Sequence, residues 1–523
     1  MALFEDSERA RAEALVRLGY FNPFLPERID LEREVLGKDF VDPGEMWHKQ
    51  ADDVEERPNI DLMMAFSKAL ADRVRARLLE GGPGNDADGA LYEDVALYYI
   101  YNKYKKQFFE HIRRLAALAS PGQASQPDTM DFYTAFRYDM EHYLAIDGAT
   151  FPSLAEAEHL FACFYQLRNA FHQIYDNIIG GSAASARLRA SVWDSIFTCD
   201  VRRYRRALYD RMGDITTLVT GPSGTGKELV ARAIGLSRYV PFNAHKMRFE
   251  ADFAARFQPI NLSALSPTLI ESELFGHAKG SFTGAVRDRA GFFEVCPTYG
   301  SVFLDEIGDL DPAIQVKLLR VLQTGTFQRI GESADRHFGG KIIAATNRDL
   351  AKQMHDGRFR EDLYYRLCSD IIVTPSLREQ LQGSPEQLRN LLRFIARRVA
   401  GDAEADALAA EVEGWITDHL GPDYSWPGNV RELEQCVRNV MVRRSYHPPQ
   451  AGRRAPREAL AEGVRAGELT AEALQRHYVT MIYAETGSYQ AAAARLGLDR
   501  RTVKSYVDSD LLQHYRGRSA QEP

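Results

Sequence analysis

Thr216-Thr-Leu-Val-Thr220 runs directly into Gly221-Pro-Ser-Gly-Thr-Gly-Lys227-Glu228, so a short apolar run is followed at once by a glycine-rich turn. A Gly-x-x-x-x-Gly-Lys spacing between a predicted strand and a predicted helix is the context that a phosphate-binding loop requires. The glycines let backbone N–H groups curl around phosphates, and the helix start adds a favourable dipole. Lys227 supplies a positive charge for the β- and γ-phosphates. The run therefore predicts an α/β nucleotide-binding domain.

Two further apolar runs end in polar side chains that suit nucleotide chemistry. Val302-Phe-Leu-Asp305-Glu306 places Asp305 to bind Mg²⁺ and Glu306 to polarise an attacking water. Adjacent acidic residues at a strand end can also be a solvated turn, but their place after the phosphate-binding loop favours the catalytic role. Asn347 ends another such run and is expected to face the γ-phosphate. Because Glu228 stands where Ser or Thr usually binds Mg²⁺, the ion must rely more on Asp305 and on water.

The chain has 523 residues, enough for about three to four domains of roughly 100–200 residues each. Alternating apolar runs and helical stretches predict a parallel sheet with crossover helices in the middle of the chain. The predicted fold class is multidomain: a helical N-terminal domain, an α/β P-loop core with a helical lid, and an all-α C-terminal domain. The predicted ranges are 1–177 for the N-terminal domain, 178–375 for the α/β subdomain, 376–445 for the lid, 446–468 for a linker and 469–515 for the C-terminal domain.

Composition narrows the class of protein. Hydrophobic residues make up 45% and charged residues 26% of the chain, which is ordinary for soluble globular proteins. No apolar run approaches the ~18 residues that span a membrane, and the N-terminus lacks a basic-then-apolar signal pattern. We therefore expect a cytoplasmic protein with no membrane partner, whose five scattered cysteines are reduced thiols. Because the net charge is -8, nucleic-acid binding would have to come from a local basic patch.

An aromatic-rich stretch of the N-terminal domain lies between two flexible breaks, 81–89 and 119–127. The helical spacing around it favours rings that pack helices together in a core, and a ligand pocket or an interface is the alternative. The domain lacks the strand–helix alternation of a phosphoreceiver domain. A small-molecule sensor, a partner-docking domain and an oligomerisation module all remain open. The aromatic residues are Tyr92, Tyr98, Tyr99, Tyr101, Tyr104, Phe108 and Phe109.

A six-residue loop, Gly280-Ser-Phe-Thr-Gly-Ala285, lies between the phosphate-binding loop and the acidic strand end. Its glycines, Gly280 and Gly284, would let the loop rise and fall. An exposed phenylalanine lowers solubility unless it is used for contact, so Phe282 and Thr283 are predicted to touch a partner. A buried hairpin aromatic is the alternative.

Together these stretches resemble the AAA+ domain of bacterial enhancer-binding proteins, the ATPases that activate sigma-54 RNA polymerase. The resemblance covers about 178–445 and implies ATP and Mg²⁺ as cofactors, sigma-54 RNA polymerase as a partner, and a homo-oligomer between a dimer and a hexameric ring. The matching stretches are GPSGTGKELVARAI (221–234), ESELFGHAKGSFTGA (271–285), FLDEIGDL (303–310), QVKLLRVLQTGTFQRIG (315–331), IIAATNRDL (342–350), GRFREDLYYRL (357–367) and WPGNVRELE (426–434).

The resemblance also implies a role for each matching residue. Asn261 would be the switch that pairs with Glu306 and responds to loss of the γ-phosphate, and Asp305 would bind the metal. Arg360 and Arg366 would reach the nucleotide of a neighbouring subunit. The catalytic residues are then Asp305, Glu306, Asn347, Arg360 and Arg366. The nucleotide would be bound by Gly221, Pro222, Ser223, Gly224, Thr225, Gly226, Lys227, Glu228 and Arg431. The sigma-54 contact would be Gly280, Ser281, Phe282, Thr283, Gly284 and Ala285.

Five features depart from the family pattern, among them Pro222, which replaces the usual Glu of the phosphate-binding loop, and the segment Trp193–Met212, which looks extended. Ser281 stands where the family usually has alanine, which is a small-for-small change. The segment Ser237–Pro259 is longer than usual. After Glu379 the usual Arg-x-x-Asp-Ile is replaced by Gln380-Leu-Gln-Gly-Ser, in a region that shapes adenine binding or the lid hinge.

The C-terminal domain shows an amphipathic helix over 469–486, an alanine-rich helix over 488–496, a glycine turn and a basic helix over 500–506. This order is typical of a helix-turn-helix and resembles the Fis-type DNA-binding domain of the same family, with a charged capping helix as the alternative. Binding to enhancer DNA as a dimer is expected, because one such unit buries little DNA surface. The predicted DNA-binding residues are Arg495, Arg500, Arg501, Thr502, Lys504 and Ser505.

The function predicted from the sequence is that of a sigma-54-dependent transcriptional activator, an oligomeric ATPase ring tethered to enhancer DNA. One alternative is a DNA-binding regulator that uses the ring without sigma-54. Another is a different AAA+ machine, such as a helicase loader. The Phe282-Thr283 loop favours the first function, because family members that abandoned sigma-54 typically lose it.

Overall fold

The computed structural model describes residues 3–42, 58–81, 85–118, 129–251, 256–382, 385–422, 424–448, 460, 464, 469–508, 511–512 and 515. Contacts divide the chain into two compact units, Met1–Arg438 and Asn439–Pro523. Most of the predicted linker 446–468 lies outside the described residues, as do 82–84 of the first predicted break in the N-terminal domain and the whole of the second, 119–127. Among the described helices, not one has the length and apolar character needed to cross a membrane.

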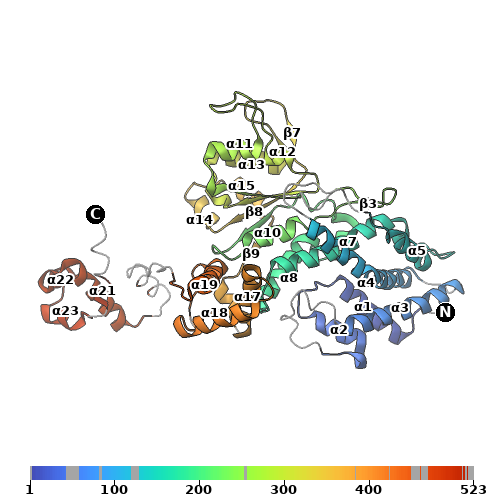
Figure 1. Cartoon of the computed structure of the whole chain (residues 1–523), viewed down its shortest axis with the longest axis horizontal. Helices are drawn as coiled ribbons and strands as arrows, with labels where there is room; N and C mark the ends of the chain where they lie inside the picture. Colours follow the sequence, from blue (N-terminus) through green and yellow to red (C-terminus); the bar gives the residue numbers. More distant parts are fainter. Residues whose placement is uncertain are drawn as a thin grey trace. The chain divides into compact units, whose positions relative to one another are not determined.

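A five-stranded sheet forms the centre of the first unit (Figure 1). Its strands follow the order β4-β5-β8-β1-β9, and every neighbouring pair is parallel. Strand β8 is buried along its whole length, as expected for a parallel strand covered on both faces. Since β1 is flanked by β8 and β9, the loops at the carboxyl ends of these strands converge. The strands are β1 (Thr217–Thr220), β4 (Phe257–Asn261), β5 (Ser301–Asp305), β8 (Lys341–Thr346) and β9 (Asp370–Val373).

Helices cover the sheet and form a lid beyond β9. The crossover helices bury apolar side chains such as Leu274, Leu318 and Leu363 against the strands. The crossover helices are α10 (Lys227–Gly235), α11 (Pro267–Phe275), α12 (Phe292–Val295), α13 (Pro312–Thr324), α14 (Leu350–His355) and α15 (Glu361–Leu367). The lid helices are α16 (Leu377–Leu381), α17 (Pro385–Ala400), α18 (Ala405–His419) and α19 (Asn429–Arg443). The predicted α/β core with a helical lid is confirmed.

The N-terminal region is helical, as predicted, and has an aromatic core. Tyr92, Tyr99, Tyr104 and Phe108 are buried there, so packing is the role of these four rings. The helices are α1 (Asp6–Tyr20), α2 (Arg28–Leu36), α3 (Pro58–Leu79), α4 (Asp86–Leu118), α5 (Tyr133–Leu144), α6 (Pro152–Ala155), α7 (Ala157–Asn177), α8 (Ala183–Phe197) and α9 (Val201–Arg203), followed by the π-helical turn η4 (Tyr204–Leu208).

Helix α7 joins this region to the sheet, because its side chains cap the helix that follows the phosphate-binding loop. Gln166 Nε2 donates to the carbonyl of Ser237 at 2.9 Å, and Asn169 Nδ2 donates to that of Leu236 at 2.8 Å. These carbonyls would otherwise be unpaired at the end of α10. The predicted boundary at residue 177 falls at the end of α7, inside the first compact unit, and its meaning as a functional boundary stays a prediction.

The long segment Ser237–Pro259 contains a short hairpin, β2 (Phe242–Asn243) with β3 (Arg248–Phe249), that packs into the N-terminal core. The ring of Phe242 lies 4.6 Å from that of Phe161, and the ring of Phe249 lies 4.5 Å from that of Tyr165. The extra residues therefore tie the ATPase core to α7 a second time.

In the second unit, three helices occur in the predicted order: α21 (Ala471–Thr486), α22 (Tyr489–Leu496) and α23 (Arg500–Tyr506). Val479, Ile482 and Val503 are buried between them. Gly487 and Gly497 end α21 and α22 in the left-handed conformation that glycine adopts readily.

Candidate functional site

The loop between β1 and α10 uses its glycines for close backbone approach. Gly221 and Gly224 have φ values of 143° and 79°. A Cβ at Gly221 would lie 2.2 Å from Thr374 Oγ1, and one at Gly224 would lie 2.4 Å from the carbonyl oxygen of Gly428. Larger residues would therefore push β9 and the lid away from the loop.

Lys227 lies folded into this loop. Its side chain is 7% exposed, and Nζ donates to the carbonyls of Gly221 at 3.0 Å and Pro222 at 3.1 Å. Burial lowers the pKa of Lys227, while the carboxylates of Glu306 and Asp305 oppose that shift. The ammonium group is thus held beside the acidic strand end.

The end of β5 brings the acidic pair to the same place. Glu306 adopts a left-handed φ of 56°, its N–H donates to Asp305 Oδ1 at 3.1 Å, and its Oε2 accepts the N–H of Asn347 at 3.3 Å. Burial raises the pKa of Asp305, and the charge of Glu306 raises it further. The predicted neighbours Glu306 and Asn347 therefore do meet. A non-glycine residue in this conformation is strained, which is common at functional sites.

The lid closes over the loop through the start of α19. Asn429 Nδ2 donates to the carbonyl of Ser223 at 2.9 Å, while its Oδ1 accepts the N–H of Leu377 at 2.8 Å. Arg431 Nη1 donates to Ser223 Oγ at 3.3 Å. Glu432, which accepts the N–H of Gly428 at 2.7 Å, holds the preceding turn. The predicted nucleotide contact Arg431 thus lies at the phosphate-binding loop.

A cavity of about 1110 Å³ joins these parts. Its walls include Lys227, Asp305, Glu306 and Arg431, together with two segments that sequence reasoning did not assign. One is the segment 177–181 at the end of α7, and the other is α17, which contributes Asn390 and Phe394. These walls come from distant parts of the chain and carry no local motif. The cavity is large enough for a nucleotide.

The remaining predicted nucleotide residues lie elsewhere. Asn261 is exposed at the end of β4, and its Oδ1 accepts from the N–H and hydroxyl of Ser263 at 3.0 and 2.8 Å. The register pairs it with Asp305, one residue before Glu306, and the Asn261–Glu306 switch stays a prediction. Arg360 forms a forked pair with Asp362 at 2.7 and 3.0 Å, and Arg366 is exposed. Within the described residues, neither arginine lines the cavity of its own chain.

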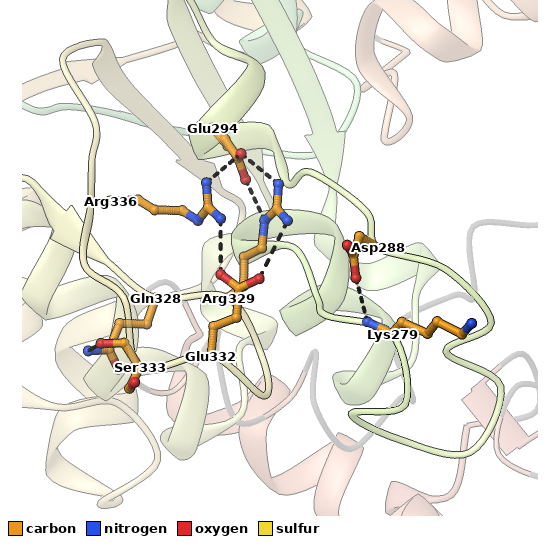
Figure 2. Close-up of polar contacts among 8 residues, drawn as sticks. All are labelled: Lys279, Asp288, Glu294, Gln328, Arg329, Glu332, Ser333 and Arg336. Carbon is orange, nitrogen blue, oxygen red and sulfur yellow. Dashed lines mark hydrogen bonds and ion pairs between the residues drawn. The ribbon is translucent and has the colours of Figure 1, made fainter.

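The loop Gly280–Ala285 is a tight, internally bonded turn. The N–H of Gly280 donates to the carbonyl of Ala285 at 2.8 Å, and both Gly280 and Gly284 have positive φ. Thr283 is exposed, but Phe282 is half-buried because its ring packs edge-on against His277 at 4.9 Å. Phe282, which was expected to be exposed, is therefore only partly so, and its contact with sigma-54 stays a prediction. Figure 2 shows Asp288 accepting the N–H of Lys279 across the loop base at 2.7 Å.

A second hairpin, β6 (Thr326–Phe327) with β7 (Arg336–His337), braces this loop. The N–H of Ala278 donates to Ile330, and the N–H of Ile330 donates to Gly276, at 2.9 and 3.0 Å. Figure 2 shows the hairpin's own anchor, in which Glu294 of α12 accepts both arms of Arg329 at 2.7 and 2.8 Å and also Arg336 at 2.8 Å. Forked charged bonds of this kind fix geometry as well as adding energy.

The predicted DNA-binding residues lie on and beside α23. Arg500, Arg501, Lys504 and Ser505 are exposed, and Asp499 caps the helix by accepting the N–H groups of Arg501 and Thr502. Three members are already engaged, since Thr502 donates its hydroxyl to Asp499, Ser505 donates its hydroxyl to the carbonyl of Thr502 at 2.8 Å, and Arg495 pairs with Glu485 at 2.9 Å.

A parallel sheet with a phosphate-binding loop after β1, an acidic pair after β5 and a helical lid defines a P-loop nucleotide-binding domain of the AAA+ class. Comparison with known proteins agrees: residues 200–372 match the family described as Sigma-54 interaction domain. The chain is 46% identical to the Nif-specific regulatory protein of Azotobacter vinelandii over 227 residues. These aligned residues make up 43% of this chain and 40% of that protein. It is 39% identical over 307 residues to the Nif-specific regulatory protein of Enterobacter agglomerans, and the aligned residues make up 55% of this chain and 54% of that protein. The solved structure of NtrX from Brucella abortus is 23% identical with a TM-score of 0.38, covering 70% of this chain and 76% of that one.

The chain therefore contains a Sigma-54 interaction domain, and its resemblance to bacterial enhancer-binding proteins is confirmed. It spans 40% and 54% of the length of the two curated relatives. The matched segment holds the phosphate-binding loop, the acidic pair and the loop Gly280–Ala285, whereas Arg431 and the C-terminal helices lie beyond it.

Proposed function

We propose that this protein is a sigma-54-dependent transcriptional activator that hydrolyses ATP in an oligomeric ring and remodels the closed RNA polymerase promoter complex while bound to enhancer DNA. One observation carries the proposal. The segment 200–372 contains the phosphate-binding loop, the acidic pair and the loop Gly280–Ala285, and helices α11 and α13 lie between them in the chain.

Different cavity residues would bind the phosphates of ATP and the divalent cation. Lys227 would exchange its two backbone carbonyl partners for phosphate oxygens, and Arg431 would add a second cation from the lid. Asp305 fits a divalent cation, because a partly buried carboxylate beside a second one is stabilised by positive charge. Mg²⁺ held there would neutralise phosphate charge.

Glu306 is the residue best placed to act on the attacking water. In hydrolysis the water oxygen bonds to the γ-phosphorus, the bond from that phosphorus to the bridging oxygen breaks, and ADP and phosphate result. Glu306 would orient the water and accept its proton, with its carboxylate held by the N–H of Asn347. Arg360 and Arg366 would stabilise the transferred charge in a neighbouring subunit's cavity, which suits their exposed position outside their own.

The strands that end at the cavity also lead to the sigma-54 loop. After β4 and Asn261, the chain passes through α11 directly into the loop. After β5 and Glu306, it passes through α13 into the hairpin β6–β7, where Ile330 is hydrogen-bonded to Gly276 and Ala278 just before the loop. A change at Glu306 on loss of the γ-phosphate would thus reach the loop from both sides.

The test is a pull-down of sigma-54 by the full chain in the presence of ADP and aluminium fluoride, which mimic the hydrolysis transition state. We expect capture that needs the nucleotide mimic and that is lost in Thr283→Ala. Thr417→Ala, the same change on exposed lid helix α18, is the matched control and should bind normally. If the trapped form captures no sigma-54, the regulator acts without sigma-54 and the proposal is wrong. If Thr283→Ala captures sigma-54 as well as the wild type does, the assignment of the contact to Thr283 is wrong.

A further inference from the structure

Arg189 of α8 is a buried cation in the wall of the nucleotide cavity. The residue is 4% exposed, and burial lowers its pKa. It forms no ion pair with the residues that the structure describes. The proposed ATPase mechanism gives this cation no role. Because a buried cation without a carboxylate partner is costly, the groups that it does contact decide what it is for.

Arg189 fixes the segment that follows α7. Its Nη1 donates to the carbonyl of Ile178 at 3.0 Å and to that of Gly180 at 2.8 Å. The guanidinium also lies 5.4 Å from the centre of the Tyr175 ring, in the last turn of α7. Gly180 has a positive φ of 121°, and a Cβ there would lie 2.5 Å from Ser185 Oγ of α8. The backbone of this segment is therefore held against both helices.

Ile179 lies between the two fixed carbonyls and has unpaired polar groups of its own. Neither its N–H nor its carbonyl makes a hydrogen bond with the part of the chain that the structure describes. Ile179 lines the cavity and is only half-buried. One donor and one acceptor on a single residue match adenine, whose N6 amino group donates beside the acceptor N7. A purine with an oxygen at position 6 presents two neighbouring acceptors instead, so its oxygen would face the carbonyl of Ile179.

The base would lie in the part of the cavity that the phosphates leave. Lys227 and Asp305 define the phosphate end, at the loops after β1 and β5. The remaining walls include Tyr175 and the segment 177–181, together with Phe394 of α17. Such walls suit a planar base, which needs apolar contact on its faces and a few polar groups at its edge.

We propose that Arg189 is a positioning residue for base selection. By fixing the carbonyls of Ile178 and Gly180, it presents the N–H and carbonyl of Ile179 to adenine, so that the cavity prefers ATP to nucleotides with an oxygen at position 6. Arg189 acts through the backbone that it fixes and does not need to touch the base. The inference rests on the proposed binding of ATP in this cavity, and it is independent of sigma-54 and of DNA.

The test measures binding of three ligands to the full chain by calorimetry, in EDTA so that none is hydrolysed. ATP and inosine triphosphate differ at position 6 of the base, and inorganic tripolyphosphate has no base. The wild type should bind ATP at least about tenfold more tightly than inosine triphosphate, which is the effect of about one hydrogen bond. Arg189→Met removes the donors, so it should weaken ATP by about tenfold and tripolyphosphate by less than about twofold.

Other variants separate the base from the phosphates. Arg189→Lys keeps the charge but not the planar fork, so the preference for ATP should fall by at least about threefold. It is read by the same ratio if Arg189→Met does not fold, which circular dichroism checks. Arg187→Met changes a nearby exposed arginine of α8 and should alter no ligand. Lys227→Ala should weaken all three ligands, because it acts at the phosphates that they share.

The outcomes distinguish this inference from the ATP site itself. If neither ATP nor tripolyphosphate binds the wild type, the proposed nucleotide cavity is wrong and the role of Arg189 falls with it. If ATP binds but is not preferred to inosine triphosphate, or if the folded Arg189 variants keep the wild-type preference, Arg189 does not position the base. Equal weakening of ATP and tripolyphosphate by Arg189→Met would mean that Arg189 only supports the fold, which also overturns the inference.

Discussion

Ser281→Ala should make the base of the sigma-54 loop harder to open, because Ser281 carries a buried hydroxyl that its surroundings do not satisfy. Its Oγ is shielded from solvent and has no hydrogen-bond partner among the residues that the structure describes. The side chain packs against Gly331, where a Cβ would lie 2.6 Å from that of Ser281. Alanine would keep this packing and remove the unpaired oxygen.

The magnitude follows from the cost of an unsatisfied polar atom. A buried hydroxyl without a partner costs about 1–3 kcal/mol. Since the residue as a whole is only half-buried, we take the lower end, ~1 kcal/mol. That change in the free energy of local opening corresponds to roughly fivefold slower amide exchange in the loop.

Hydrogen exchange of the full chain, read by mass spectrometry on peptides over 276–291, measures this opening. Global unfolding of a chain with several domains is not two-state, so a local readout is needed. Ser272→Ala is a control of opposite sign, because Ser272 Oγ lies 2.7 Å from His277 Nδ1 and His277 supports Phe282. We expect slower exchange in Ser281→Ala and faster exchange in Ser272→Ala. Unchanged or faster exchange in Ser281→Ala would refute the reasoning.

Three further outcomes follow from the structure. Arg431→Ala should raise the Kd for ATP by about tenfold, because it removes a cation from the phosphate-binding loop, whereas Arg438→Ala on the exposed side of α19 should not. Burial lowers the pKa of Lys341 to about 8 from 10.5, so between these values the unfolded chain binds more protons. The free energy of local opening of β8 should therefore rise with pH across this window relative to Lys341→Met, and equal slopes in hydrogen exchange of peptides over 341–346 would contradict it. Removing residues 1–177 deletes the side chains of α7 that bind the last carbonyls of α10. We therefore expect aggregation in gel filtration and loss of ATPase activity in a phosphate-release assay. A stable, active remainder would show that α7 is dispensable.

The nucleotide site could be predicted from the sequence because its chemistry is local. Lys227 follows the loop after β1, and Glu306 and Asn347 directly follow β5 and β8; in a parallel sheet the carboxyl ends of neighbouring strands converge. The walls formed by residues 177–181 and by Phe394 could not be predicted, because packing of distant helices creates them. The same limit applies to Phe282, whose partner His277 is close in sequence but whose contact depends on how the loop folds back.

The aromatic residues of helix α4 lie on two faces, which aromatic content alone does not distinguish. Tyr92, Tyr99 and Phe108 lie on a face that is buried in the N-terminal core and carries no charge. Tyr98, Tyr101 and Phe109 lie at helical spacing on a second face, along a cavity of about 650 Å³ in the N-terminal region. On that second face the cations Lys105, Lys106 and Arg113 continue the same stripe. The core interpretation holds for the buried rings Tyr92, Tyr99 and Phe108, whereas the ligand-pocket interpretation stays a prediction for the other face of the same helix.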